Sequence, residues 1–195
     1  MISADFEKLI NSFTKLPSVG MRSAERYAYS IINMKTEDAE NLAHNILAVK
    51  HNIKLCSVCG NFTTEDVCDI CKNRKSDVIC VVKEPKDIIN FEKIKNFNAL
   101  FHVLHGTLSP MKNITPNDLN INSLLTRISN GNIKEVIIAL SSDVEGEATS
   151  MYLAKLLKPL DIKVTRLAQG ISLGTEIEYV DSATLERAYS DRKEL

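Results

Sequence analysis

Four cysteines constrain this chain more than any other feature of its sequence. They follow the spacing C-x2-C-x8-C-x2-C, at Cys56, Cys59, Cys68 and Cys71. Two cysteines separated by two residues can place both sulfurs about 2.3 Å from one metal ion, and a second such pair completes a tetrahedron. The polar segment between the pairs is too short to fold through its own apolar packing. We therefore expect one structural zinc ion, because metal binding supplies roughly 10–16 kcal/mol of apparent free energy in small zinc domains.

Two disulfide bonds are the alternative for the same four cysteines. Nothing else in the chain indicates an oxidising compartment, so zinc is the favoured interpretation. Four thiolates would also fill the coordination sphere and leave no open position for a catalytic water. The metal is therefore expected to stabilise structure. The fifth cysteine, Cys80, stands inside an apolar run and is expected to be a small buried side chain.

The composition limits the class of protein further. A chain of 195 residues, 44% of them hydrophobic, can bury one large core and a smaller one. No apolar run approaches the about 18 residues that span a bilayer. The first residues do not resemble a signal peptide, so a cytoplasmic location without membrane contact is expected. Because the formal net charge is −1, any nucleic-acid binding has to come from local basic patches.

The N-terminal part reads as three helices. The first covers residues 3–13 with Ser3 as its cap, the second covers residues 21–34, and the third begins with Thr36 as its cap. Between the first two stands Leu-Pro-Ser-Val-Gly at residues 16–20, a helix stop followed by a turn.

This helix, turn and helix looks like a helix-hairpin-helix, a motif that grips a DNA phosphate with backbone N–H groups. Arg22 and Arg26 stand four residues apart and project from one face of the second helix, with Lys15 nearby. An ordinary helical hairpin with solvated arginines is the alternative. The motif also usually has glycine where Ser18 stands, which restricts the backbone at the turn.

After the cysteines the pattern changes to short apolar runs that alternate with helical patterns. This alternation is typical of a parallel sheet covered by helices on both faces. The expected strands cover residues 78–82, 100–104, 136–140 and 162–167, the expected helices cover residues 87–94, 117–128 and 147–157, and a last helix follows at about residues 182–189.

Acidic residues follow two of these strands, in Lys-Glu-Pro-Lys-Asp at residues 83–87 and in Ser-Ser-Asp-Val-Glu-Gly-Glu at residues 141–147. Carboxylates at the carboxyl ends of neighbouring parallel strands could hold magnesium beside a phosphate. The alternative, which we favour, is that Asp143, Glu145 and Glu147 start a helix, because acids near a helix N-terminus interact favourably with its dipole.

The order of these parts resembles the RecR family of bacterial recombination mediators. The most specific stretches include Leu-Pro-Ser-Val-Gly, the four cysteines, Val-Glu-Gly-Glu-Ala-Thr at residues 144–149 and Lys-Val-Thr-Arg-Leu-Ala-Gln-Gly at residues 163–170. The resemblance implies a multidomain α/β protein with four parts. These are a helix-hairpin-helix domain (1–53), a four-cysteine zinc finger (54–76), a Toprim domain with a parallel sheet (77–168) and a C-terminal segment for oligomerisation (169–195).

The resemblance also implies which residues the Toprim enzymes would use. They carry a glutamate after the first strand and an Asp-x-Asp after a later one, but here these positions read Lys83 and Ser141-Ser142-Asp143. With two of three carboxylates replaced, the site cannot hold divalent metal as the enzymes do. The remaining family acids, Asp87, Glu145 and Glu147, are expected to serve partner contact or a weakly bound regulatory Mg²⁺.

Three functions remain open from the sequence. The first is a non-enzymatic mediator of DNA repair that binds double-stranded and gapped DNA through Arg22, Arg26 and Lys15. The family resemblance adds RecO-like and RecF-like partners, assembly as a dimer or ring-like tetramer, and help in loading recombinase. The second is a metal-dependent phosphotransfer enzyme that uses Glu84, Asp143 and Glu145. The third is a zinc-stabilised adaptor that binds only protein.

Overall fold

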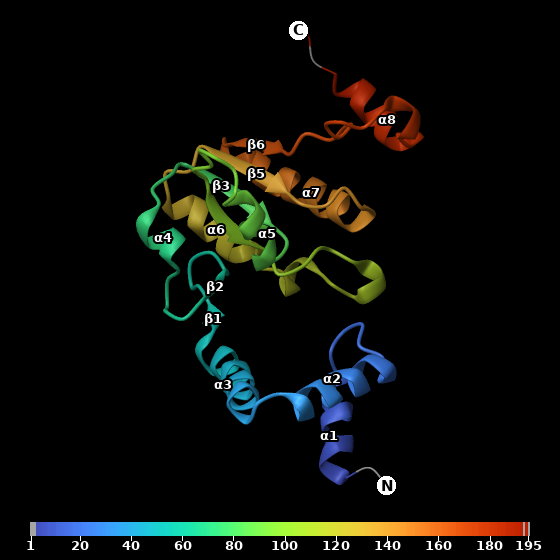
Figure 1. Cartoon of the computed structure of the whole chain (residues 1–195). Coiled ribbons are helices and arrows are strands. Elements are labelled where there is room, and N and C mark those ends of the chain that lie inside the picture. Colours follow the sequence, from blue (N-terminus) through green and yellow to red (C-terminus); the bar gives the residue numbers. More distant parts are fainter. Residues whose placement is uncertain (1–2, 193, 195) are drawn as a thin grey trace. The chain divides into compact units, whose positions relative to one another are not determined.

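The computed structural model describes residues 3–192 and residue 194. The chain divides into two compact units, Met1–Ile53 and Lys54–Leu195. Figure 1 labels most of the helices and strands of both units.

The first unit is a helical domain. Its helices are α1 (Ala4–Phe13), α2 (Met21–Asn33) and α3 (Thr36–Asn52). The expected cap of α1 is confirmed, because the Ser3 side chain accepts the backbone N–H of Phe6 at 3.3 Å. The cap expected at Thr36 is wrong. Lys35 holds the N-cap position in an extended conformation, no side chain caps α3, and Thr36 is already helical.

The core of the first unit lies between α1 and α2. Phe6 and Ile10 of α1 are buried against Ala24 and Ala28 of α2. The two alanines let the helices approach closely, because they present almost no side chain at the contact. Unlike these two helices, α3 has no buried residue, so its apolar side chains remain exposed.

The second unit contains the cysteine segment, the sheet and the C-terminal helix. Its elements in chain order are β1 (Lys54–Leu55), β2 (Phe62–Thr63), α4 (Asp69–Asn73), β3 (Val78–Val82), α5 (Pro85–Phe91), β4 (Leu100–Val103), α6 (Ile121–Asn130), β5 (Glu135–Ala139), α7 (Val144–Leu157), β6 (Lys163–Arg166) and α8 (Ser182–Ser190), with short 3-10 turns between some of them. None of the helices described is long and apolar enough to cross a membrane.

The predicted parallel sheet is confirmed. Its four strands run in the order β4-β3-β5-β6, and all three neighbouring pairs are parallel. The chain passes from β3 to β4 on one side and then to β5 on the other. The carboxyl ends of β3 and β5 therefore lie at the point where the strand order reverses, which is where α/β sheets bind ligands.

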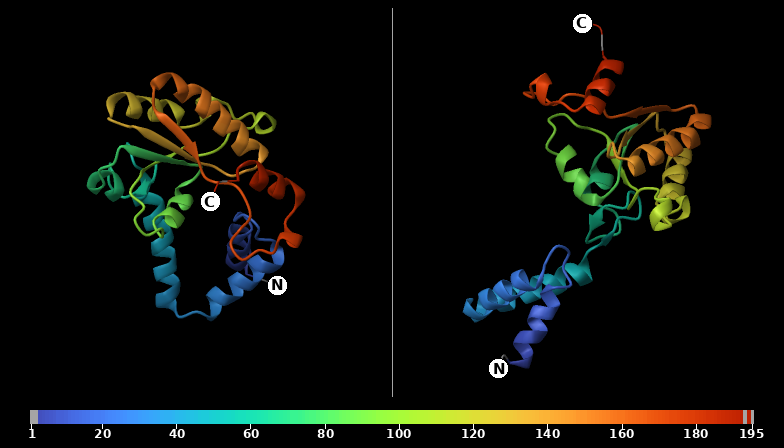
Figure 2. Two further views of the ribbon diagram at one scale, coloured as in Figure 1. Left: turned by 90° about the horizontal axis from the view of Figure 1, so that it is seen from above. Right: turned by 90° about the vertical axis from the view of Figure 1, so that its right-hand side faces the viewer.

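Helices cover both faces of the sheet (Figure 2). One face packs against α6 and α7, where Leu124 and Leu153 are fully buried with Ile79 and Val81 of β3. On the other face, Cys80 and its neighbours pack against Ile88 of α5. Successive residues of β3 enter opposite cores, as strand geometry requires. This explains why the whole run is apolar instead of alternating.

Three predicted helix starts in the second unit differ from the structure. The helix α5 begins at Pro85, two residues earlier than expected, because Glu84 and Asp87 form its capping box. The helix α6 begins at Ile121, because Pro116–Asp118 forms a separate 3-10 turn closed by Thr115. The helix α7 begins at Val144, three residues earlier than expected, because Asp143 caps it.

The buried His102 is an unusual feature of β4. Its Nε2–H donates to the Asn120 carbonyl at 2.7 Å, while Nδ1 has no hydrogen-bond partner among the described residues. Burial lowers the pKa of His102 to about 4, helped by the positive charges of Arg127 and His105. A proton on Nδ1 would be both desolvated and unpaired.

We predict that shortening a core leucine destabilises the second unit strongly. Leu153→Ala on α7 should lower the free energy of unfolding by roughly 2–5 kcal/mol, because a fully buried side chain leaves a cavity. Met151→Ala on the same helix is the control, since Met151 is 71% exposed and should change stability little. Urea unfolding followed by circular dichroism measures both, and equal losses would contradict the assigned core.

We also predict that His102 makes the fold acid-sensitive. The pKa of His102 in the folded chain lies below the ordinary value of 6.5. The stability that the neutral ring contributes to the fold is therefore complete above pH 6.5 and is lost as the pH falls towards 4. Between pH 7 and pH 5 the free energy of unfolding should fall by about 2 kcal/mol more in the native chain than in His102→Gln. Urea titrations at both pH values test this, and parallel pH profiles for the two proteins would refute it.

Candidate functional site

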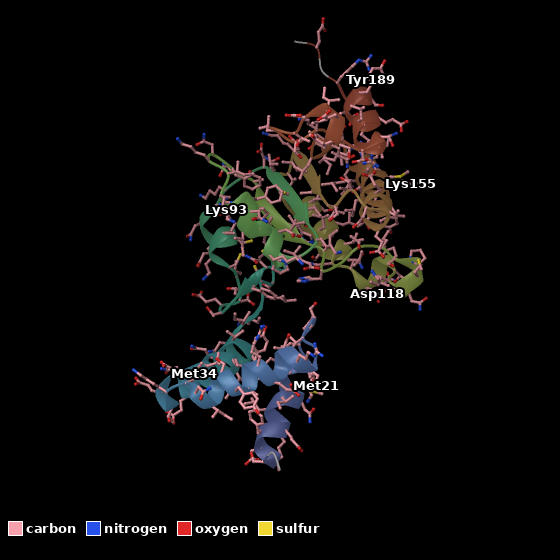
Figure 3. All side chains as sticks on the ribbon, turned by 45° about the vertical axis from the view of Figure 1, so that its right-hand side comes forward. Met21, Met34, Lys93, Asp118, Lys155 and Tyr189 are labelled. Atoms are coloured by element: carbon pink, nitrogen blue, oxygen red, sulfur yellow. The ribbon has the colours of Figure 1, made fainter. Side chains whose placement is uncertain are left out.

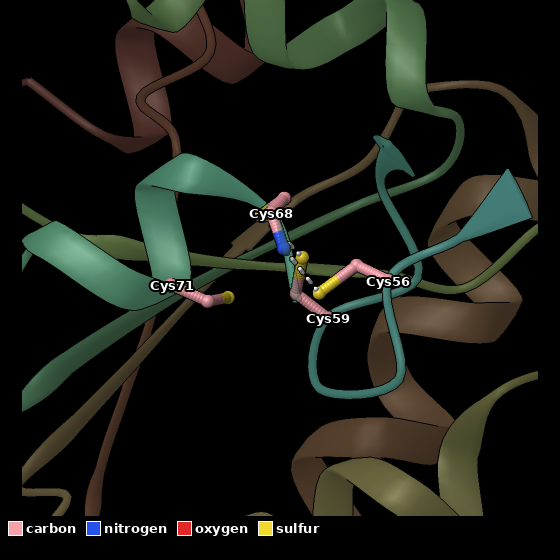
Figure 4. A group of neighbouring side chains, drawn as sticks. All are labelled: Cys56, Cys59, Cys68 and Cys71. Atoms are coloured by element: carbon pink, nitrogen blue, oxygen red, sulfur yellow. Dashed lines mark hydrogen bonds between the residues drawn. The ribbon is translucent and has the colours of Figure 1, made fainter. Parts of the chain in front are cut away.

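The four cysteines lie together, as their spacing predicts (Figure 4). Their sulfurs all lie within 4.8 Å of one another, and the Cys59 and Cys68 sulfurs are 3.6 Å apart. A zinc ion bound by four sulfurs at about 2.3 Å places them about 3.8 Å apart, so the observed cluster has the size of such a site. Three of the four side chains are buried, and that of Cys71 is partly exposed.

Backbone groups around the cluster favour thiolates. The N–H of Cys68 donates to the Cys56 sulfur at 3.3 Å, and the N–H of Asn61 donates to the Cys59 sulfur at 3.4 Å. Burial acts to raise the pKa of Cys56, but backbone N–H groups outweigh it and the pKa falls to about 7.

The other thiols show why the cluster needs a cation. A hydrogen bond with Cys71 and burial raise the pKa of Cys59 above its ordinary value, and burial raises the pKa of Cys68 to about 11. Four neighbouring anions repel one another unless a cation lies among them. The donor set therefore fits zinc in both geometry and charge.

The cysteine segment is fastened to the edge of the sheet. The N–H of Val103, on the edge strand β4, donates to the Cys59 carbonyl at 2.8 Å. Gly60, the next residue, has φ +76°, and a Cβ there would lie only 2.8 Å from Nε2 of His105. Only glycine combines this conformation with so close a contact.

Arg74 provides a second attachment. Its guanidinium donates to both carboxylate oxygens of Glu92, at 2.9 and 2.8 Å, and to the Ala99 carbonyl at 2.9 Å. Such a bidentate pair fixes the orientation of both side chains. Cys80 lies apart from the cluster in the sheet core, as expected, and burial raises its pKa to about 12.

The hairpin in the first unit has the expected form. Ser18 adopts φ +62°, so a serine occupies the left-handed conformation for which the motif normally uses glycine. Gly20 is the N-cap of α2, and no side chain caps that terminus. Met21 and Met34 mark the two ends of α2 in Figure 3. Backbone N–H groups at an uncapped helix start can receive an anion.

The three predicted DNA-binding side chains are all exposed. Lys15 precedes the turn, while Arg22 and Arg26 lie on the first two turns of α2. The Arg26 guanidinium lies 5.6 Å from the centroid of the Tyr27 ring. This contact restrains the arginine while leaving it accessible to solvent.

The acidic residues after β3 and β5 act first as helix caps. Glu84 and Asp87 form a capping box at α5, in which the Glu84 N–H donates to Asp87 at 2.8 Å. Asp143 accepts the N–H of Gly146 at 2.7 Å and caps α7. An ion pair with Lys86 holds the pKa of Glu84 below its ordinary value. The predicted role of Asp143, Glu145 and Glu147 at a helix start is confirmed, because Asp143 is the N-cap of α7 and the other two stand in its first turn.

Glu145 binds a loop that sequence reasoning did not connect to it. Its carboxylate accepts hydrogen bonds from Ser109 at 2.7 Å, Lys112 at 3.1 Å and Thr107 at 3.2 Å. Hydrogen bonds from Ser109 and Lys112 hold the pKa of Glu145 below its ordinary value. Gly146 permits this geometry, because a Cβ there would lie 2.1 Å from the Ser141 carbonyl oxygen.

Glu147 binds residues close to the C-terminus instead. It accepts hydrogen bonds from Gln169 and Arg187, both at 2.9 Å, and from Arg166 at 3.4 Å. Hydrogen bonds from Gln169 and Arg187 hold its pKa below the ordinary value. The sequence did not predict these three contacts, although Arg166 and Gln169 stand in the family-like stretch at residues 163–170; Arg187 stands further on, in α8.

The structure does not gather the acids into a metal site. Asp87, Glu145 and Glu147 each engage a different element. Among the described residues, only the four cysteines form a group of three or more potential ligands close enough to hold one ion. Lys83 and Ser141, which stand where the enzymes have carboxylates, are a cation and a neutral hydroxyl.

Comparisons with known proteins match four regions of the chain. Family models match the Toprim domain at residues 77–168, the RecR helix-hairpin-helix at 6–50, the RecR four-cysteine zinc finger domain at 53–73 and the RecR C-terminal region at 170–193.

Two similar relatives cover nearly the whole chain. A protein of Clostridium perfringens (strain 13 / Type A) named Recombination protein RecR is 52% identical over 188 residues, which are 95% of this chain and 94% of the relative. A protein of Enterococcus faecalis (strain ATCC 700802 / V583) with the same name is 50% identical over 190 residues, 96% of each chain. On this similarity, the chain belongs to the RecR family.

Proposed function

We propose that this protein is a DNA-binding mediator of recombinational repair that holds DNA without breaking or joining it. One observation carries the proposal. At the carboxyl ends of β3 and β5, two of the three Toprim carboxylates are replaced, and the acids that remain bind groups of the protein itself. A magnesium ion there would lack most of the oxygen ligands that phosphoryl transfer requires. The relatives named for recombination support the same interpretation.

The DNA would bind at the helical hairpin. The uncapped start of α2 offers backbone N–H groups to a phosphate, and the exposed Arg22 and Arg26 supply positive charge beside it. Lys15 adds a third cation at the turn. These groups would contact the phosphate backbone and not the base edges. Binding would therefore depend on the structure of the DNA more than on its base sequence.

Zinc would be held by Cys56, Cys59, Cys68 and Cys71, and its role would be structural. The ion would complete the small segment that is fastened to β4 through Val103 and to α5 and its neighbours through Arg74. It would supply no reaction step, because four sulfurs leave no position for water.

Self-association would strengthen weak binding by a single subunit. The helix α3 exposes a group of large apolar side chains on the first unit: Leu42, Ile46, Leu47 and Val49. Such patches mark interaction surfaces in proteins of this size. Several copies around one duplex would raise affinity through effective concentration. By analogy with the family, we propose a dimer or ring-like tetramer that acts with RecO-like and RecF-like partners to help load recombinase on gapped DNA.

We predict that the cysteine cluster binds one zinc ion per chain. Cys59→Ser should lose the metal and unfold residues 54–75, because three ligands and a hydroxyl cannot order that segment. Cys80→Ala, which removes a buried cysteine outside the cluster, should keep one zinc. Metal analysis of the purified proteins measures the stoichiometry. The prediction of a zinc site would be contradicted if Cys59→Ser kept one zinc per chain. It would also be contradicted if the native chain held disulfide bonds and no zinc.

We predict that Arg22 and Arg26 contact DNA phosphates. The double change to alanine should weaken binding to a gapped duplex and reduce the slope of log K against log salt by about two units, one for each lost contact. Lys35→Ala with Lys50→Ala is the matched control, because it removes the same charge from exposed positions at the two ends of α3. Fluorescence anisotropy over a range of salt measures the slope. If both double variants change it equally, the two arginines do not form the interface.

A further inference from the structure

The C-terminal segment, residues 170–192, is attached to the second unit in an unusual way. None of its residues is buried. Large apolar side chains along it remain exposed, with Leu173 fully exposed and Tyr179 75% exposed. Figure 1 shows α8 beyond the end of β6, apart from the helices that cover the sheet. Apolar burial within one chain therefore contributes little to its position.

Polar contacts with one carboxylate take the place of that burial. Arg187 of α8 donates to Oε1 of Glu147 at 2.9 Å, and the same nitrogen donates to the side-chain carbonyl oxygen of Gln169. Gln169 donates to Oε1 of Glu147 at 2.9 Å and to the Ser142 hydroxyl at 2.8 Å. The segment is thus linked to the start of α7 and to the loop after β5.

The second oxygen of the carboxylate is also engaged. Arg166 of β6 donates to Oε2 of Glu147 at 3.4 Å and lies 3.8 Å from a carboxylate oxygen of Asp191, at the end of α8. Two guanidinium groups and one amide therefore share a single carboxylate. Without that carboxylate, Arg166 and Arg187 would become two neighbouring cations that repel each other.

Glu145 provides a natural comparison on the same helix turn. It stands two residues earlier, so its side chain projects about 200° around the helix from that of Glu147. Its partners lie in the loop of Thr107, Ser109 and Lys112, and none belongs to the C-terminal segment. The two acids thus hold two different segments against α7.

We propose that Glu147 is an ionic clasp that keeps the C-terminal segment docked on the Toprim sheet. Because the segment buries so little apolar surface, its docking depends on this one charge and weakens as salt screens it. Glu147 is a positioning residue in this role. The inference goes beyond the proposed function and does not rest on DNA binding.

Hydrogen exchange of the full chain, followed by mass spectrometry of peptides, tests the proposal. At low salt, Glu147→Gln should raise the exchange rate of residues 170–192 by about two- to fivefold, which is the size expected from losing the one partly exposed ion pair, with Arg187, that links Glu147 to the segment. Arg187→Gln should have a similar effect, and the double variant should add little to either single change. Unchanged peptides from β3 and β5 show that the fold is intact.

The matched control is Glu145→Gln, which should raise exchange in residues 106–113 and leave residues 170–192 unchanged. Added sodium chloride should speed exchange of the segment more in the native chain than in Glu147→Gln, in which only the Arg166–Asp191 pair remains to be screened. The proposal is overturned if the single variants at Glu147 and Arg187 leave the segment as protected as before. It is also overturned if Glu145→Gln releases the segment equally, or if salt acts on the native chain and Glu147→Gln alike.

Discussion

The architecture of the second unit depends on the position of β3 between β4 and β5. This strand is buried on both faces, and its residues enter two separate cores in alternation. Its central place brings the carboxyl ends of β3 and β5 side by side, with the capped starts of α5 and α7 directly after them. Every acidic residue considered as a metal ligand owes its position to this pairing.

The acids at this edge of the sheet make contacts within the chain. In a phosphoryl-transfer site, carboxylates stay close together because a divalent cation neutralises them. Here the neutralising charge comes from side chains of the chain itself, since Lys112 pairs with Glu145 while Arg166 and Arg187 pair with Glu147. The acids consequently point in different directions and hold a loop and a terminal segment. The first turn of α7 thus contacts two segments that are far apart in the sequence.

The sequence predicted features that depend on neighbouring residues. The spacing of the four cysteines is enough to predict that their sulfurs lie together. Short runs rich in β-branched residues likewise predict the strands. The role of Asp143, Glu145 and Glu147 at a helix start follows from acids that stand together before a helical pattern, although the sequence placed that start three residues too late. The partners of Glu147 could not be predicted, because Arg187 stands 40 residues away and only the folded sheet brings it near. The Thr36 cap failed for a local reason, since Lys35 took the extended conformation that a cap requires.

The bond between the Cys59 carbonyl and the Val103 N–H has a consequence for solubility. The strand β4 borders the sheet, and its outward N–H at this position is occupied by the cysteine segment. Exposed edge strands can pair with strands of other molecules and so start aggregation. A chain without its metal would therefore lose the order of the cysteine segment and would also expose the edge strand β4 to pairing with other chains. Loss of the metal would then lower the solubility of the protein as well as the order of the cysteine segment.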